Sequence, residues 1–174
     1  SYLRELPAFA GEVYRRGFTS RIYSNSSAAD AEGAFIKNVG AKVAEGINHI
    51  QSIPPAASTA YKTFAQHAGI PENTLAIFPS NVWDQVAVIA LAIEKSGSAD
   101  PAVFTKSILD VVNSPGETVE NPVAGLKALR EGKNIAYSGA GADFEFQATG
   151  DQLHRTYGHF IIKDGANQLK GLIQ

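Results

Sequence analysis

The sequence predicts an α/β protein, and three observations support this class. Apolar residues recur at helical spacing through most of the first three quarters of the chain. Short apolar segments alternate with these helical ones, as they do in layered α/β folds. The last quarter instead alternates apolar and polar residues over short segments, which is the period of a β-strand.

The first 52 residues predict a helix, a strand, a second helix and a second strand. Gly17 is placed to end the first helix, and a short strand follows at 21–23. The polar segment 24–30 supplies turn and N-cap residues before a short helix over 35–39. A strand is expected at 47–52, where two prolines stop it. The first helix has an apolar face formed by Leu6, Phe9, Val13 and Tyr14.

Four helices are predicted between residues 58 and 132. They cover 58–69, 81–96, a segment that begins at Asp100-Pro101, and a segment from Asn121-Pro122 to near Gly132. The helix over 81–96 has the strongest pattern, and because it is apolar over most of its girth we expect it to be buried. Its apolar stripe consists of Val82, Val86, Ile89 and Ile93.

The end of the chain predicts strands. A turn is expected at 114–117, and strands are expected at 144–146, 154–163 and 168–173. Asp164-Gly165 between the last two strands is a signal for a two-residue β-hairpin turn.

Composition excludes several classes of protein. A length of 174 residues suffices for one domain or for parts of two. A net charge of −2 gives no electrostatic reason to expect a nucleic acid or an anionic membrane as partner. The absence of cysteine excludes disulfides and thiolate metal sites. No apolar run is long enough to span a bilayer.

The first residues favour a fragment of a longer protein. The chain begins Ser1-Tyr2-Leu3 and contains no methionine. This start is not a signal peptide, because it lacks a basic segment followed by an apolar one. We therefore expect a piece that was cut at its N-terminal side, with any export signal lost with the missing part.

The glycine-rich stretch "YSGAGADFEFQATGD", residues 137–151, raises the question of a phosphate-binding loop. Such a loop needs a lysine and a hydroxyl residue after its last glycine, and a helix behind them. Here Gly141 is followed by Ala142, an acid and a strand-like alternation. We therefore interpret the stretch as a connection whose glycines serve turn geometry.

No catalytic or metal-binding pattern is present. The chain has no G-x-S-x-G nucleophile elbow, although a triad that forms only in space stays an alternative. His154 and His159 are five residues apart on a predicted strand and so point to opposite faces. His49 and His67 stand alone. The sequence thus predicts no catalytic residue, no metal site and no cofactor, and it favours binding over catalysis.

The order of several separated motifs resembles one family. These motifs are "NVWDQVAVIALAIEKSGSADPAVFTKSILDVVNSPGETV" at 81–119, "ALREGKNIAYSGAGADFEFQATGDQL" at 128–153 and "YGHFIIKDG" at 157–165. The chain is similar to the C-terminal half of the periplasmic substrate-binding proteins of branched-chain amino-acid-type ABC transporters. Those proteins typically show "YDAV…LAxAIEKAGS", then "GxxIxYxGASGPxxFDxxGD", then a "KDG" hairpin.

The resemblance implies the type I periplasmic binding protein fold, which has two three-layer α/β/α lobes with the ligand between them. It implies that this chain is a C-terminal fragment whose N-terminal half lies elsewhere. Residues 1–46 would belong to the C-terminal lobe, and 47–52 would be a hinge-crossing strand. Residues 53–145 would be part of the N-terminal lobe, and 146–174 would return to the C-terminal lobe.

The resemblance also implies candidate ligand-binding residues. In amino-acid-binding members, an acid in the loop after a C-terminal-lobe strand faces the ligand ammonium. The matching segment 24–27 contains Asn25 and Ser26 but no acid. Because an ammonium opposite neutral groups is costly to bury, a carboxylate without an amine, or an amide, is one expectation. The alternative is that Asp30 supplies the acid and that the ligand is an amino acid.

Phe78 matches an aromatic residue that walls the side-chain pocket in branched-chain-binding members. The alternative role of Phe78 is that of a core residue at a helix N-terminus.

The implied function is extracytoplasmic: a periplasmic component of an ABC importer that delivers a small molecule to membrane permease subunits. Two alternatives stay open, a cytoplasmic small-molecule sensor of the same fold and an α/β hydrolase.

Overall fold

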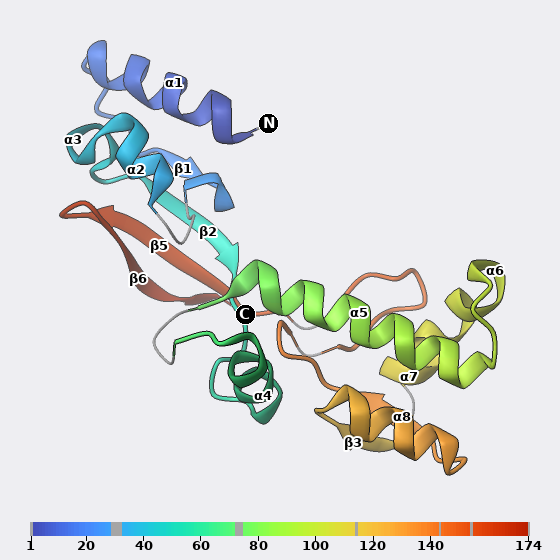
Figure 1. Ribbon diagram of the computed structural model, residues 1–174. Helices are drawn as coiled ribbons and strands as arrows, with labels where there is room; N and C mark the ends of the chain where they lie inside the picture. The colour runs from blue at the N-terminus through green and yellow to red at the C-terminus, as the bar shows by residue number, and fades with distance from the viewer. Residues whose placement is uncertain are drawn as a thin grey trace. The chain divides into compact units, whose positions relative to one another are not determined.

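The computed structural model describes residues 2–28, 33–71, 75–113, 115–142, 144–153 and 155–173. The chain forms two compact units, which are described separately below (Figure 1). Unit 1 consists of two segments, Ser1–Ser52 and Tyr157–Gln174. Unit 2 is the continuous segment Ile53–Thr156 between them.

Unit 1 contains a mixed four-stranded sheet with the order β1-β2-β5-β6. Strands β1 and β2 are parallel, and the other neighbours are antiparallel. The predicted hairpin is confirmed, since Asp164 and Gly165 connect β5 to β6 with φ angles of 53° and 74°, as a two-residue primed turn requires. The elements are α1 (Tyr2–Arg15), β1 (Tyr23–Ser24), the 3₁₀ helix η1 (Ser26–Ala28), α2 (Ala34–Val39), α3 (Ala41–Ala44), β2 (Asn48–Ser52), β5 (Tyr157–Lys163) and β6 (Ala166–Ile173).

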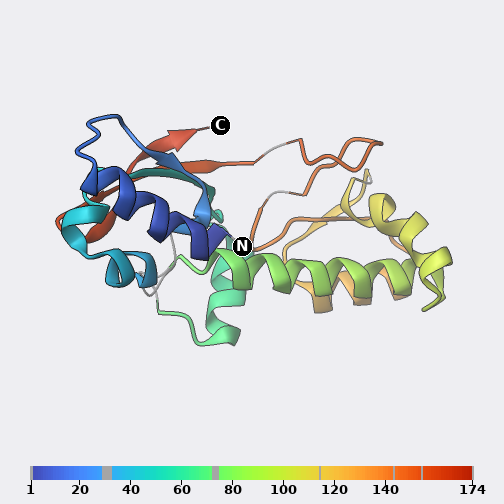
Figure 2. The same ribbon diagram turned by 90° about the horizontal axis from the view of Figure 1, so that it is seen from above.

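Helices cover one face of this sheet. Figures 1 and 2 show α1, α2 and α3 on the same side of the strands. A buried apolar cluster joins the two layers, and its members include Ala10, Phe35, Ala44, Ile47 and Ile162. Unit 1 is therefore held together by packing between helices and one sheet face.

Unit 2 combines helices with a small second sheet. Strands β3 and β4 pair in parallel, from Glu117 opposite Ile135 to Val119 opposite Tyr137. The elements are α4 (Thr59–Ala68), α5 (Ile77–Ser96), α6 (Pro101–Phe104), the 3₁₀ helix η2 (Thr105–Ser107), α7 (Ile108–Val112), β3 (Glu117–Val119), α8 (Pro122–Arg130) and β4 (Ile135–Tyr137).

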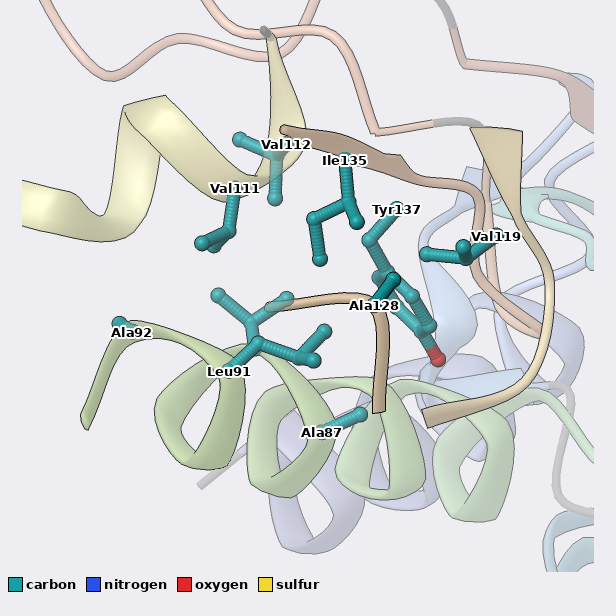
Figure 3. Packing of buried hydrophobic residues seen from close by; sticks show 10 residues of the cluster. Ala87, Leu91, Ala92, Val111, Val112, Val119, Ala128, Ile135 and Tyr137 are labelled. Atoms are coloured by element: carbon teal, nitrogen blue, oxygen red, sulfur yellow. The ribbon is translucent and has the colours of Figure 1, made fainter. Parts of the chain in front are cut away.

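The core of unit 2 lies between α5, α7, α8 and the two strands. Figure 3 shows Leu91 of α5 directed toward the side chains of α7 and β4. Gly125 of α8 permits this packing, since a Cβ built there would lie 2.8 Å from a Leu91 methyl carbon. The labelled members are Ala87, Leu91, Ala92, Val111, Val112, Val119, Ala128, Ile135 and Tyr137.

The predicted burial of the α5 stripe is wrong. The helix exists, although it begins at Ile77 rather than Asn81. The side chains of Val82, Val86 and Ile89 are exposed by 56%, 64% and 43%. The opposite face packs into the core instead, through Ala87, Val88, Leu91 and Ala92.

Two strands were not predicted and one predicted strand is absent. Strands β3 and β4 have three residues each, which is too short for a periodic signal. The expected strand at 144–146 is only an isolated bridge between Phe146 and Gln152. The expected strand from 154 begins at Tyr157, and His154 lies outside the described residues. Helix α3 was also not predicted.

The remaining helices agree with prediction in position. Ser58 caps α4 by accepting a hydrogen bond from the Tyr61 amide at 3.1 Å, and Gly69 and Gly97 end α4 and α5 with left-handed φ angles. The helix expected from Asp100 is divided into α6, η2 and α7. Among the described helices, none is both long and apolar enough to cross a membrane.

Candidate ligand-binding site

The loop after β1 carries two of the predicted ligand-binding residues. Asn25 follows β1 directly and is exposed, and Ser26 begins η1 and is half-buried. Because β1 and β2 are parallel, their carboxyl ends lie at the same sheet edge, where α/β proteins commonly bind ligands. The loop thus occupies a typical binding position. Asp30, the alternative acid, lies outside the described residues.

A partly buried chain of hydrogen bonds connects this loop to the sheet. The Nδ2 of Asn167 in β6 donates to the carbonyl oxygen of Ala28 at 3.4 Å. The Oδ1 of Asn167 lies 2.9 Å from Nε2 of His49 in β2. Since Oδ1 can only accept, Nε2 carries the proton and donates. Two forms of His49 can make this hydrogen bond and so help to position η1: the neutral ring with its proton on Nε2, and the cation.

Burial favours the neutral form of His49. Its side chain is fully buried and stacks on the Phe160 ring, with centroids 5.0 Å apart. Its Nδ1 finds no hydrogen-bond partner among the described residues. Desolvation lowers the pKa of His49, the His159 charge acts in the same direction, and the hydrogen bond to Asn167 opposes them. His49 is therefore a positioning residue for the loop.

Gln51 is a further polar group near this sheet edge. It lies two residues after His49 on the same face of β2 and one residue before the strand ends. Its side chain is buried, and its Oε1 has no hydrogen-bond partner among the described residues. Sequence reasoning missed it, because a single glutamine in an apolar strand has no motif.

Phe78 lies in the first turn of α5, in unit 2. Its side chain is 61% exposed. It is therefore not a member of the core formed by the described residues, and both roles considered for it stay predictions. The ring is free to contact a ligand or another part of the protein.

Arg155, Asn81 and Gln152 form a polar cluster in unit 2. Arg155 donates from one guanidinium nitrogen to Oδ1 of Asn81 at 3.4 Å and from another to Oε1 of Gln152 at 3.2 Å. Its buried Nε has no hydrogen-bond partner within the described part of the chain. Because both contacts are neutral amides, the guanidinium charge is suited to binding an anion. No sequence motif indicated this cluster.

The glycine-rich stretch surrounds a buried carboxylate rather than a phosphate site. Asp84 of α5 accepts hydrogen bonds from the backbone amides of Ala140 at 2.8 Å and Gly141 at 2.5 Å. It also accepts one from the Tyr137 hydroxyl at 2.9 Å. A Cβ on Gly139 would lie 2.6 Å from a carboxylate oxygen of Asp84. The glycines therefore permit close approach, and the expectation that they serve turn geometry is wrong for Gly139 and Gly141, whose φ angles are not positive.

The environment of Asp84 shifts two pKa values. Burial raises the pKa of Asp84, and the three hydrogen bonds partly oppose this. Burial, together with the Asp84 charge, also raises the pKa of Tyr137, which stays a neutral donor. Asp84 faces no open site and serves to hold the loop.

Nothing in the described residues assembles a metal centre, since no group of three histidine, aspartate or glutamate side chains lies close enough. A cavity of about 530 Å³ lies beside α4 and is lined in part by Tyr61, Ala65 and Ile70. It contains none of the predicted site residues. Asn25 and Ser26 belong to unit 1 and Phe78 to unit 2.

Comparison with known proteins identifies the fold. No protein-family model and no curated protein matches the chain. Among solved structures, the leucine-binding protein LivK of Thermotoga maritima aligns with 99% of this chain at 19% identity and a TM-score of 0.71. The chain has the type I periplasmic binding protein fold.

Other type I structures give the same result. The isoleucine-bound LivJ of Streptococcus pneumoniae, a branched-chain amino-acid transporter binding protein, aligns with 99% of this chain at 13% identity and a TM-score of 0.63. An extracellular ligand-binding receptor from Rhodopseudomonas palustris aligns with 95% at 20% identity and a TM-score of 0.56. The predicted fold is confirmed. The chain spans 43%, 42% and 44% of the lengths of these three proteins.

Proposed function

We propose that this chain is part of a periplasmic solute-binding protein that captures a small organic molecule and delivers it to the membrane subunits of an ABC importer. One observation carries the proposal: almost the whole chain aligns with a leucine-binding protein and with a branched-chain amino-acid transporter binding protein. Unit 1 would then belong to the C-terminal lobe and unit 2 to the N-terminal lobe. Residues 47–52 would form one hinge crossing.

The site residues support a ligand that carries a carboxylate and an apolar part. Asn25 and Ser26 are neutral, so they offer nothing to balance a ligand ammonium. Arg155 offers a cation whose described contacts are amides. Phe78 offers an exposed ring for apolar contact. Within unit 2, Arg155 and Phe78 suit an aliphatic or aromatic carboxylate, and an amide is the neutral variant.

Asp30 decides between this ligand class and an amino acid. If its carboxylate reached the site, it would balance an ammonium, and branched-chain amino acids would bind. The Asp30→Asn variant separates the two ligands, because it should weaken binding of an amino acid and leave binding of a simple carboxylate unchanged.

A thermal-shift screen of the longest soluble form of the protein tests the proposal. The screen compares aliphatic and aromatic carboxylates, their amides and branched-chain amino acids. A true ligand raises Tm in a concentration-dependent way, with about 2.7 kcal/mol of added stability at 100 times Kd. No shift with any of them, together with turnover of an ester or amide substrate, would instead favour a hydrolase.

Two variants connect a positive result to the site. Phe78→Ala should weaken binding about tenfold or more, because an aromatic side chain loses roughly 1.5–3 kcal/mol of burial. Arg155→Met should weaken the binding of carboxylates more than the binding of amides. Arg130→Met is the matched control, since Arg130 lies on the exposed side of α8 and pairs with Glu94. Recovery of the native protein from the periplasmic fraction would separate the importer component from a cytoplasmic sensor.

A further inference from the structure

Helix α5 carries an apolar stripe that the described residues of unit 2 leave exposed. Val82, Val86 and Ile89 follow one another at spacings of four and three residues, so they lie on one face of the helix. Between 43% and 64% of the surface of each of these residues is exposed. A contiguous apolar face of this kind is typical of an interaction surface, because a helix facing water is normally polar there.

The stripe cannot be the normal packing face of the helix. That face is on the other side, where Ala87, Leu91 and Ala92 are buried in the core shown in Figure 3. Helix α5 is therefore apolar on two sides, one of which the described residues of unit 2 cover. The pattern is that of a helix placed between two layers.

The sheet of unit 2 is an independent sign that this unit is incomplete. It consists of β3 and β4 alone, which pair in parallel over three residues each. Parallel sheets are normally larger, have further strands beside them and are covered on both faces. Two strands of this length would not form a stable sheet without neighbours. The helices and strands of unit 2 are thus those of part of an α/β/α lobe.

We propose that the stripe is a docking surface for the polypeptide that completes the lobe of unit 2. This polypeptide corresponds to the portion of the related structures that this chain does not span, because the chain accounts for 42–44% of their lengths. The inference rests on the proposed function for the identity of the lobe. The docking segment is apolar and uncharged where it meets Val82, Val86 and Ile89, since these side chains offer only hydrocarbon.

Thiol labelling tests the proposal, because these 174 residues contain no cysteine, and the reaction of the unsubstituted longer product is subtracted as background. Val86→Cys places one thiol in the stripe. Lys106→Cys is the matched control, since Lys106 is an exposed charged residue of η2 in the same unit. Each variant is made in the 174-residue chain and in the product of the complete reading frame, and the rate of reaction with Ellman's reagent is measured.

We expect the thiol at position 86 to react at least tenfold more slowly in the longer product than in the 174-residue chain. The thiol at position 106 should react at the same rate in both. Equal rates for the Val86→Cys variant in the two products would overturn the proposal, as would a reading frame no longer than this chain. Protection in the 174-residue chain that rises with its concentration would also overturn it, because a second copy would then be the occupant.

A second measurement uses the longer product alone and so does not require the 174-residue chain to fold. Val86→Glu should lower its Tm by more than 5 °C, whereas Lys106→Glu should leave it nearly unchanged. An unchanged Tm for Val86→Glu would mean that the stripe faces water and would contradict the proposal. Neither readout involves a ligand, so a failed ligand screen and an unprotected stripe are separate results.

Discussion

Two loops of the molecule are each held by one buried polar side chain, and the two anchors differ in chemistry. In unit 2, the loop 139–142 is held by Asp84, which has three hydrogen-bond donors around its carboxylate. In unit 1, the loop 25–28 is held through Asn167 by His49, one ring nitrogen of which has no partner in the described residues. The first anchor is fully hydrogen-bonded, and the second is not.

The difference sets how each loop responds to substitution and to pH. The carboxylate lies close to the backbone of Gly139 and Gly141, so a side chain added at either position is costly. Burial of the imidazole favours its neutral form. The pKa of Asp84 is raised, so the folded state holds this proton more tightly than the unfolded chain does. Stability therefore decreases as pH rises through the folded-state pKa, and the three hydrogen bonds to the carboxylate limit the loss. The pKa of His49 is lowered, so its contribution is present above the ordinary histidine pKa and is lost as pH falls.

Removal of the Asp84 carboxylate should have the largest effect. Asp84→Ala leaves three buried donors without an acceptor, and each costs about 1–3 kcal/mol, so we expect a loss of about 3 kcal/mol or more in the free energy of unfolding. Chemical denaturation measures it. Asp110→Ala is the control, because Asp110 is exposed in the same unit. A loss below about 1 kcal/mol for Asp84→Ala would mean that water replaces the carboxylate.

A methyl group at Gly139 should have the next largest effect. Gly139→Ala places its Cβ against the Phe144 ring and 2.6 Å from the Asp84 carboxylate, and the forced shift should cost about 1–3 kcal/mol by denaturant unfolding. Gly171→Ala has no heavy atom within 4 Å of the added carbon and should be close to neutral. If both variants had equal stability, close approach would not explain the glycine at position 139.

Acid should weaken unit 1 through His49. As pH falls below about 6.5, the unfolded chain takes up a proton that the folded ring resists, at about 1.4 kcal/mol for each unit by which the pKa is lowered. The slope of unfolding free energy between pH 7.5 and 5.5 should decrease in His49→Gln. The slope should be unchanged in His67→Gln, since His67 is exposed on α4. An unchanged slope in His49→Gln would assign the pH dependence to another group.

Removal of an ordinary helix cap should have the smallest effect on stability, and its size is a reference for the other variants. The Oδ1 of Asn121 accepts from the Val123 amide at 2.8 Å at the start of α8. Asn121→Ala should cost about 1 kcal/mol in the free energy of unfolding, and Asn121→Asp should restore most of it. If Asn121→Ala were as damaging as Asp84→Ala, Asp84 would be no more than a local cap.

The sequence predicts the capped helices well, because their signals are local. Ser58 and Asn121 begin helices, and Gly69 and Gly97 end them, where the spacing indicates. The three-residue strands are missed because two alternate positions cannot establish a period. The orientation of α5 is also missed. Periodicity detects apolar faces but does not say which of two faces the rest of the same unit covers.

The candidate site is less accessible to sequence reasoning than the fold. Asn25, Ser26 and Phe78 were found only through resemblance to a family, and their binding roles stay predictions. Gln51 and Arg155 were missed because their significance lies in unpaired buried atoms. Such atoms depend on the neighbours that the fold provides. The buried role of Asp84 was missed for the same reason, since its partners are backbone amides about 56 residues away.

The insertion of unit 2 into unit 1 has a consequence for the order of folding during synthesis. Strand β2 ends at Ser52, but its partner β5 begins only at Tyr157, after the whole of unit 2. Unit 2 is continuous and can begin to collapse while the sheet of unit 1 still lacks two strands. Closing that sheet requires a long-range contact, which is intrinsically slow. The exposed edge of β2 is thus the segment that a chaperone would need to protect while translation continues.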